Sequence, residues 1–285
     1  MTENPQLPVF YINLDSRQDR RAFMEEQFGR LSMAAERFPA VTMDEVPPEL
    51  VARHADPRHL WPVSNGDLAC GLSHQAIWRM MVERGLQAAL VLEDDAILSD
   101  RVRDFLDDDI LARTKCDVLK LETRRKHVLL GGKLGSVGSS ALHELQSSHM
   151  GGAAYILNLG TARASLASPQ VNDFGVDRFL FGKAGPHLLR SRILQVVPSP
   201  VVQLDRLDPS PSYRPEGAAR SDLSAPRNDR VRAPRRLPAL GSLVTVNVDH
   251  VGRLLRLAAR DASVIGRRRK LVPYADDPAK STEAL

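Results

Sequence analysis

The fold is decided by a stretch in which an apolar run ends in three acids, Ala88-Ala89-Leu90-Val91-Leu92-Glu93-Asp94-Asp95. Five consecutive apolar residues predict a strand that is buried on both faces, as in parallel sheets covered by helices. In open α/β sheets, ligands bind just beyond the carboxyl ends of the strands. The sequence therefore places three carboxylates where a binding site is expected.

Strand and helix patterns alternate on both sides of this stretch. Short apolar runs predict further strands at residues 9–14, 36–41, 117–121, 153–157 and 193–197. Helical spacing predicts helices at residues 17–28, 48–54, 67–83, 100–112, 161–167 and 176–181, with Gly29 ending the first and Gly85 the third. The Gly- and Ser-rich residues 124–150 predict a mobile loop or small hairpins. This order predicts an α/β fold with a mostly parallel sheet flanked by helices.

Composition excludes several classes of protein. The chain has 285 residues, of which 43% are hydrophobic and 26% charged, so a sizeable core is expected. We find no apolar run near the roughly 18 residues that span a bilayer, and the first ten residues do not resemble a signal peptide. Two cysteines, Cys70 and Cys116, are too few for a disulfide scaffold or a four-cysteine zinc site. We expect two reduced thiols in a cytoplasmic protein.

The positive charge gathers near the C-terminal end. Residues 213–270 carry 14 Lys and Arg against 5 Asp and Glu, a net charge of +9, whereas the whole chain carries +4. We divide the chain into a catalytic domain at 1–204, a Pro- and Arg-rich linker at 205–240 and a basic amphipathic, helical tail at 241–285. A basic tail predicts an anionic partner, and we favour a membrane surface. Nucleic acid is less favoured, because the tail has no aromatic residue for base stacking before Tyr274.

The acidic triplet allows two interpretations. Three successive carboxylates repel one another by on the order of 4 kcal/mol per pair at about 4 Å and an effective dielectric near 20. A divalent cation, Mg²⁺ or Mn²⁺, would replace that repulsion with coordination by Glu93, Asp94 and Asp95. The alternative is a solvated acidic cluster at a helix N-terminus. The triplet alone does not decide between them.

Two other groups of residues carry chemistry. Arg17, Arg20 and Arg21 stand at the start of a predicted helix, where cations oppose the helix dipole unless an anion such as phosphate lies nearby. Ser73 and His74 are adjacent on a predicted helix, so they point about 100° apart and do not form a catalytic pair with each other. The alternatives are solvent-facing arginines and a buried structural histidine.

Together these blocks resemble glycosyltransferase family 25, the lipooligosaccharide galactosyltransferase group, to which collagen galactosyltransferases are related. The resemblance covers roughly residues 8–204. Its motifs are Ile12-Asn13-Leu14 with Arg20-Arg21, Phe38-Pro39-Ala40-Val41, Gly66-Asp67-Leu68-Ala69-Cys70-Gly71-Leu72-Ser73-His74 with Trp78, Leu92-Glu93-Asp94-Asp95, Gly152-Ala153-Ala154-Tyr155-Ile156-Leu157, Val176-Asp177 and Pro200-Val201-Val202-Gln203. Thr42-Met43 departs from the family's Asp-Gly at that place.

The resemblance implies a GT-A-like fold, a nucleotide-sugar donor such as UDP-galactose, a divalent metal and an inverting transfer. It assigns Glu93, Asp94 and Asp95 to the metal. It assigns substrate-binding roles to Asn13, Arg17, Arg20, Arg21, Ser73, Tyr155 and Gln203. We assign catalytic roles to His74 and to Asp177, the candidate general base, with Glu122 and Asp173 as alternatives.

On this interpretation the protein is a cytoplasmic enzyme, peripheral on the inner membrane face, that adds a hexose to an oligosaccharide or a lipid-linked glycan of the cell envelope. Two other functions remain open from the sequence. One is a metal-dependent hydrolase on a similar sheet. The other is a non-catalytic binding protein that keeps the glycosyltransferase fold.

Overall fold

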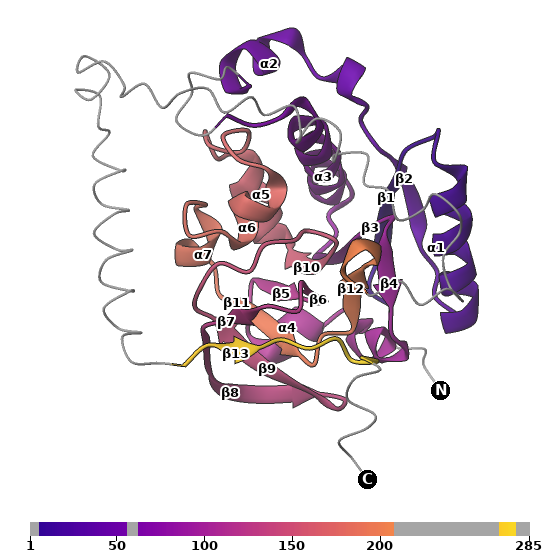
Figure 1. The fold of residues 1–285 in the computed structure, drawn as a ribbon, viewed down its shortest axis with the longest axis vertical. Helices are drawn as coiled ribbons and strands as arrows, with labels where there is room; N and C mark the ends of the chain where they lie inside the picture. The colour runs from indigo at the N-terminus through magenta and orange to yellow at the C-terminus, as the bar shows by residue number, and fades with distance from the viewer. Residues whose placement is uncertain (1–5, 56–61, 208–267, 278–285) are drawn as a thin grey trace, which may run out of the picture.

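The computed structural model describes residues 6–55, 62–207 and 268–277. Its centre is an eight-stranded sheet (Figure 1). In spatial order, the strands are β2 (Glu36–Pro39), β1 (Val9–Asn13), β3 (Ala88–Glu93), β10 (Ala154–Asn158), β5 (Val118–Lys120), β11 (Ile193–Val197), β9 (Ser140–Leu145) and β8 (Leu130–Val137). The strands predicted from apolar runs are all present, within a few residues of the predicted bounds.

The prediction of a mostly parallel sheet is wrong, because the sheet is mixed. β2, β1 and β3 run parallel, as do β5 and β11. β10 is antiparallel to both β3 and β5, and the β8–β9 hairpin joins the edge through an antiparallel pairing of β9 with β11. A strand that is apolar throughout has the same pattern in either direction, so the sequence of β10 carries no sign of its orientation.

Seven α-helices surround the sheet in the described part of the chain. They are α1 (Gln18–Leu31), α2 (Pro48–His54), α3 (Asn65–Arg84), α4 (Ile110–Thr114), α5 (Leu159–Leu166), α6 (Val176–Phe181) and α7 (His187–Arg190). Gly85 caps α3 with a φ of 66°, as predicted. Gly29 does not end α1, because Ser32 takes the left-handed capping position instead. The helix predicted at 100–112 is divided into the 3₁₀ helix η2 (Asp100–Phe105) and α4.

Helices cover both faces of the sheet, and the alternation of side chains along β3 shows how. Leu90 and Leu92 pack in one cluster with Phe23 of α1 and Phe105 of η2. Ala89 and Val91 point the other way and pack with Trp78 of α3 and with α6. Because β3 is covered on both sides, each of its apolar side chains is almost fully buried. This three-layer packing holds the carboxyl end of β3 rigidly in place.

A second, small sheet brings three distant segments beside that end. β4 (Ala96–Leu98), β12 (Val201–Gln203) and β6 (Glu122–Thr123) lie in the order β4-β12-β6. β12 runs antiparallel to β4 and parallel to β6. The 3₁₀ helix η3 (Leu204–Arg206) follows β12 directly. Residues 93–95, 122–124 and 201–206 are therefore neighbours.

The region 124–150 forms the hairpin β8–β9, one of the two predicted alternatives. Part of the predicted tail packs on the body: β13 (Lys270–Leu271) pairs with β7 (His127–Val128), and Val272 and Tyr274 are buried. The predicted linker after Leu207, the start of the tail up to residue 267, and the chain end beyond residue 277 lie outside the described residues. In the part of the chain that the structure describes, no helix is both long and apolar enough to cross a membrane.

Candidate active site

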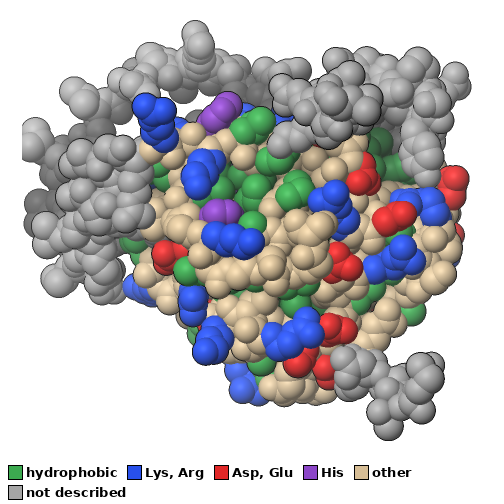
Figure 2. All heavy atoms as spheres, turned by 90° about the horizontal axis from the view of Figure 1, so that it is seen from below, with side chains coloured by type: hydrophobic (Ala, Val, Ile, Leu, Met, Phe, Trp, Pro, Cys, Tyr) green, Lys and Arg blue, Asp and Glu red, His purple; other side chains and the backbone are tan. Residues whose placement is uncertain are grey.

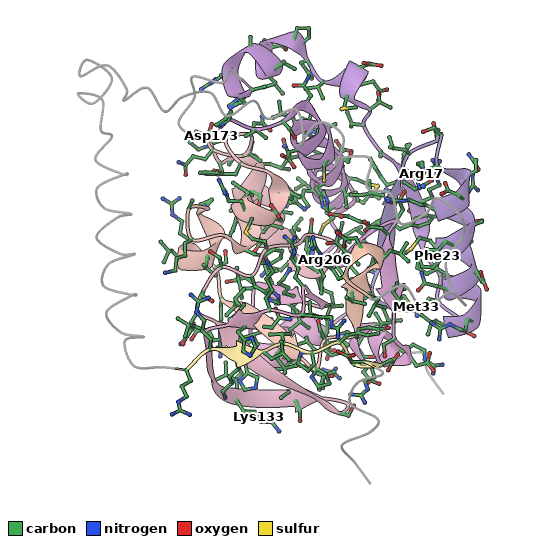
Figure 3. All side chains as sticks on the ribbon, in the orientation of Figure 1. Arg17, Phe23, Met33, Lys133, Asp173 and Arg206 are labelled. Atoms are coloured by element: carbon green, nitrogen blue, oxygen red, sulfur yellow. The ribbon has the colours of Figure 1, made fainter. Side chains whose placement is uncertain are left out.

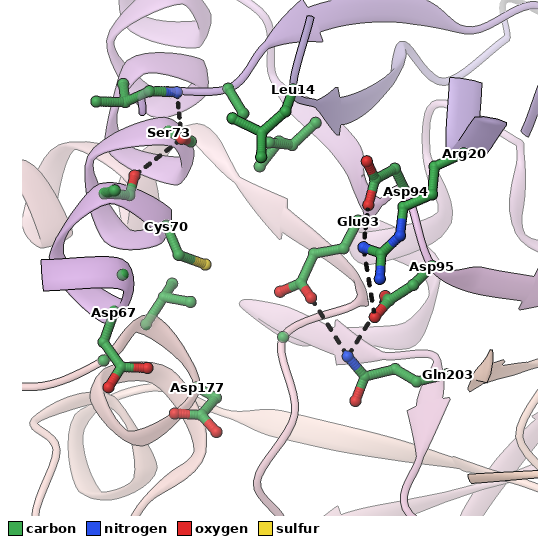
Figure 4. A pocket seen from close by; sticks show the side chains of 18 of the residues that line it. Leu14, Arg20, Asp67, Cys70, Ser73, Glu93, Asp94, Asp95, Asp177 and Gln203 are labelled. Atoms are coloured by element: carbon green, nitrogen blue, oxygen red, sulfur yellow. Dashed lines mark hydrogen bonds and ion pairs between the residues drawn. The ribbon is translucent and has the colours of Figure 1, made fainter. Parts of the chain in front are cut away.

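A cavity of about 380 Å³ opens beyond the carboxyl ends of β1 and β3. The register pairs Ile12 of β1 with Glu93 of β3, so the two strands end level with each other. Figure 4 shows Asp67, Cys70 and Asp177 on one side of the pocket, Asp94, Asp95 and Gln203 on the other, and the Glu93 carboxylate between them. The site thus lies where the sequence predicted it.

Asp94 is the anchor between β3 and α1. Its Oδ1 accepts a hydrogen bond from Arg20 Nη1 at 2.7 Å, and its Oδ2 accepts one from Asn13 Nδ2, also at 2.7 Å. All three residues are buried. With both oxygens engaged by protein groups, Asp94 is the least suited of the three predicted metal ligands, and Asn13 is a support beneath the pocket.

The arginines at the start of α1 have carboxylate partners within the chain. Arg20 lines the pocket and pairs with Asp94. Arg17 pairs with Asp19 at 2.8 Å, and Arg21 pairs with Glu25 at 2.8 Å on the exposed side of the helix. Arg17 and Arg21 are not among the pocket-lining residues, contrary to the position expected of phosphate ligands. The negative charges expected near the arginines at the start of α1 are therefore supplied by Asp94, Asp19 and Glu25, not by a bound phosphate.

Glu93 and Asp95 face the pocket with the Gln203 amide between them, and Arg20 Nη1 lies 4.0 Å from Asp95 Oδ2. Gln203 Nε2 lies 3.3 Å from Glu93 Oε2 and 3.4 Å from Asp95 Oδ1. Their side chains are only 22% and 14% exposed. Burial, reinforced by the neighbouring carboxylates, raises the pKa of Glu93 and that of Asp95 to about 8 each. Two buried carboxylates that repel each other would bind a cation favourably.

These donors fit Mg²⁺ or Mn²⁺, which prefer hard oxygen ligands. Glu93 and Asp95 would hold such an ion, with the Gln203 side chain adjacent. A second possible set consists of Cys70, His74 and Glu93, whose donor atoms all lie within 4.8 Å of one another.

His74 is fully buried beneath the pocket wall, one turn along α3 from Cys70. The Trp78 indole N–H donates to Tyr155 Oη at 3.1 Å, and Tyr155 Oη lies 2.8 Å from His74 Nδ1. Because the indole only donates, the Tyr155 hydroxyl keeps its own proton to donate to Nδ1, an arrangement that would leave the His74 proton on Nε2. Nε2 faces Glu93 Oε1 at 3.4 Å.

His74 lies behind Glu93 without a hydrogen bond to it, because its Nε2 has no hydrogen-bond partner among the described residues. Burial lowers the pKa of His74 to about 3, so the ring is neutral at physiological pH. Neither His74 nor Tyr155 lines the pocket. The predicted catalytic role of His74 and the predicted substrate contact of Tyr155 therefore do not match their positions.

Ser73 does line the pocket, but its hydroxyl is engaged. Its Oγ donates to the Ala69 carbonyl at 2.9 Å and accepts from the Val41 amide at 2.9 Å. It thereby fastens the segment 40–44, which also lines the cavity, to helix α3.

Asp177 lies in the first turn of α6 and lines the pocket. Its Oδ1 accepts from the Arg178 amide at 2.6 Å, and its Oδ2 lies 3.4 Å from the Gly151 amide. The alternative base Glu122 is fully buried against Lys120, 3.4 Å away. The other alternative, Asp173, contacts His54 at 3.2 Å and lies apart from the pocket residue Arg206 (Figure 3). Asp177 is the only one of the three in the pocket lining.

Gly151 lies between the carboxylates of Glu122 and Asp177, where only a residue without a side chain fits. Its φ is +103°, and a Cβ there would lie 2.2 Å from Glu122 Oε1. Any side chain at this position would displace Glu122 or the backbone that contacts Asp177. Gly151 directly precedes the motif that starts at Gly152, so a Gly-Gly pair was a further signal in the sequence.

Other pocket residues were also missed. They are Arg124, Arg206, Asp67, Asp205 and the segment Thr42–Asp44. Arg124 lay in a region predicted as loop, and Arg206 in a region predicted as linker. No local pattern marks either as part of a site, because only the pairing of β6 with β12 brings them to the pocket.

Comparison with known proteins gives the family. The profile of glycosyltransferase family 25 (LPS biosynthesis protein) matches residues 6–180, and the chain belongs to this family. A glycosyltransferase 25 family member of Drosophila melanogaster is 39% identical over 95 residues, 30% of this chain and 16% of that protein. Procollagen galactosyltransferase 1-B of Xenopus laevis is 32% identical over 132 residues, 42% of this chain and 22% of that protein.

A bacterial relative matches a larger share of both chains. The lacto-N-neotetraose biosynthesis glycosyltransferase LgtB of Neisseria meningitidis serogroup B is 29% identical over 154 residues, 52% of this chain and 56% of that protein. The chain thus aligns with about a sixth of the insect relative's length and just over half of the bacterial relative's length.

Proposed function

We propose that this protein transfers a hexose, galactose, from a UDP-sugar to a glycan hydroxyl with inversion at the sugar carbon. The observation that carries the proposal is the pair Glu93 and Asp95 at the end of β3, in one pocket with Asp177. One relative, named a procollagen galactosyltransferase, supports the choice of sugar, and another, named a glycosyltransferase of lacto-N-neotetraose biosynthesis, supports a glycan acceptor.

The chemistry needs two functions that the pocket residues would supply. In a single displacement, the acceptor oxygen bonds to the sugar carbon while the bond from that carbon to UDP breaks, and one base receives the acceptor proton. Asp177 would receive it. A divalent cation held by Glu93 and Asp95 would, when bound, stabilise the negative charge that develops on the departing diphosphate.

For the acceptor and the location, we propose an oligosaccharide or lipid-linked glycan of the cell envelope, reached at the cytoplasmic face of the membrane. The net charge of +9 on residues 213–270 supports attraction to an anionic leaflet. On the face seen in Figure 2, Lys and Arg side chains of the described residues are interspersed with Asp and Glu rather than gathered in one basic patch. The membrane proposal therefore rests on the residues outside the described part.

A donor screen tests the central proposal. Thermal melting is measured with UDP-galactose, UDP-glucose and UDP-N-acetylhexosamines, each with Mn²⁺ and with EDTA, because a ligand of the native state raises its apparent stability. We expect a metal-dependent rise that is largest for UDP-galactose. No rise with any nucleotide sugar would contradict the proposal. Release of free sugar in the presence of glycan acceptors, without transfer, would favour the hydrolase instead.

The membrane proposal needs a test that keeps the body intact. Truncation near residue 204 would remove Val272 and Tyr274 from the core. Co-sedimentation with anionic and neutral vesicles should instead compare the full chain with a variant in which Arg253, Arg256 and Arg260 are replaced by Gln. Equal pelleting of the two proteins on anionic vesicles would argue against the tail as the anchor.

A further inference from the structure

Two arginines reach the pocket from neighbouring segments. Arg124 directly follows β6, and Arg206 ends η3, which follows β12. β6 and β12 are paired in parallel with Val202 opposite Thr123, so the chain leaves both strands at the same edge. Both arginines line the same cavity as Glu93 and Asp95.

Their guanidinium groups retain unused donors. The Nε atoms of Arg124 and Arg206 are buried and have no hydrogen-bond partner among the described residues. For Arg206 the adjacent Asp205 carboxylate is near, with Nε and Oδ1 3.1 Å apart, but it does not meet hydrogen-bond geometry. A buried donor without an acceptor is unfavourable, so a ligand that supplies acceptor atoms would be stabilised there.

The backbone beneath these side chains is held in place. The Arg125 side chain donates to the Arg206 carbonyl at 3.3 Å, and its other terminal nitrogen lies 3.0 Å from Asp277 Oδ2. The Arg124 amide lies 3.3 Å from His149 Nε2. These contacts connect the turn after β6 with η3 and with Asp277. The backbone that carries Arg124 and Arg206 is therefore held in place.

The charge of the pocket indicates which ligand fits. Seven acids and three arginines line the cavity, and one of those arginines, Arg20, is paired with Asp94. A diphosphate brings further negative charge into this acidic pocket and requires cations around it. Arginine suits phosphate because its planar donors match two phosphate oxygens at once. An acidic pocket that binds a nucleotide sugar would need both a metal ion and free arginines.

We infer that Arg124 and Arg206 form the subsite that receives the phosphate oxygens of the nucleotide-sugar donor. The inference rests on the proposed function and deepens it, because it assigns the phosphate contacts to residues outside the motifs of the family resemblance. It replaces Arg17 and Arg21 as the expected phosphate ligands. The same chemistry would suit a phosphate on the acceptor, and the test distinguishes the two sources.

Isothermal titration of UDP and of uridine, both with saturating Mn²⁺, tests the inference. We expect Arg124→Gln and Arg206→Gln each to weaken UDP binding about 10- to 100-fold, the value of one or two charge-assisted hydrogen bonds, and to leave uridine affinity unchanged. Arg124→Lys should recover only part of the loss, because it restores the charge without the paired donors. Arg21→Gln is the matched control and should bind UDP like the parent protein.

Thermal melting confirms that each variant is folded before its affinity is interpreted. Unchanged UDP affinity in both Gln variants would overturn the inference. A raised KM for a phosphorylated acceptor alongside unchanged UDP affinity would assign the arginines to the acceptor and would also overturn it. If the parent protein binds no UDP, the proposed function itself fails, which is a distinct result.

Discussion

Two groups of arginines in this protein look alike in charge and differ in what surrounds them. Arg17, Arg20 and Arg21 cluster in the sequence at a helix start, and each has a carboxylate partner within the chain. Arg124 and Arg206 lie 82 positions apart in the chain and meet only in the folded protein. Their buried Nε atoms have no hydrogen-bond partner among the described residues, although Arg206 lies beside the Asp205 carboxylate. The comparison shows that arginines adjacent in the sequence can all be paired with carboxylates of the same chain. The arginines available to a ligand come instead from positions far apart in the sequence.

Asp94 and Asp95 differ in the same way, since Asp94 is paired within the chain and Asp95 faces the pocket. The largest loss of activity is expected for a substitution of Asp95. Asp95→Asn should abolish metal-dependent donor binding and turnover, because it removes one of the two carboxylates that would hold the ion. Calorimetric titration with Mn²⁺, with and without UDP, measures it. Asp94→Asn is the control, and its main effect should be on stability. Equal Mn²⁺ affinity in the parent and in Asp95→Asn would refute the assignment of Asp95.

Asp177→Asn should reduce turnover by roughly 10²- to 10⁴-fold, the usual contribution of a general base, while UDP-sugar affinity is retained. Asp173→Asn should keep full activity, since Asp173 does not line the pocket. Steady-state kinetics with saturating donor separates the two. A loss of less than tenfold in Asp177→Asn would mean that Asp177 has a structural role, through its contacts with the Arg178 and Gly151 amides.

Arg20→Gln should act on stability rather than on phosphate binding. Removing one partner of a buried ion pair costs about 3–5 kcal/mol, and the Arg20 and Asp94 side chains are 7% and 11% exposed. Urea unfolding of Arg20→Gln, Asp94→Asn and the double variant forms a cycle that isolates the interaction. A destabilisation below about 1 kcal/mol, combined with a large loss of UDP affinity, would place Arg20 with the ligand-binding arginines.

Stability should depend on pH through Glu93 and Asp95. Their pKa values are about 8 in the folded protein, well above the ordinary values of carboxyl groups near 4. Between those values the folded state holds more protons than the unfolded state, so the free energy of unfolding should fall as pH rises from about 4 to about 8. Melting curves in EDTA should show this fall and Mn²⁺ should reduce it. The same slope in the double variant Glu93→Gln, Asp95→Asn would contradict the prediction.

The smallest effect is expected for Arg21→Gln. Arg21 and Glu25 are both about half exposed, and such surface pairs contribute about 0–1 kcal/mol. Unfolding free energy should change by at most about 0.5 kcal/mol, and UDP affinity should not change. A clear loss of UDP affinity would restore the phosphate role expected from the sequence.

Much of the local structure and the outline of the site could be predicted from the sequence. The buried run of β3, the apolar spacing of α3, and the capping Gly85 each follow from residues close together in the chain. Glu93 and Asp95 were found for the same reason, since an acidic motif that follows an apolar strand is a local pattern. Asp177 and Gln203 entered only through the resemblance to family 25, and the pocket places them with these acids.

By itself, the sequence determined the central strands and most of the longer helices, and that carboxylates stand at the end of a buried strand; it did not predict the small sheet of β4, β12 and β6. The spacing of apolar residues indicates which side chains of a strand or helix face the core, and this spacing is a property of neighbouring residues in the chain. The tertiary structure decided the reversed direction of β10, the pairing of Arg20 with Asp94, the burial of His74 behind Glu93, and the arrival of Arg124 and Arg206 in the pocket. Each of these depends on the residue that meets it from a distant part of the chain, and the charge or donor left for a ligand is known only once those internal partners are in place.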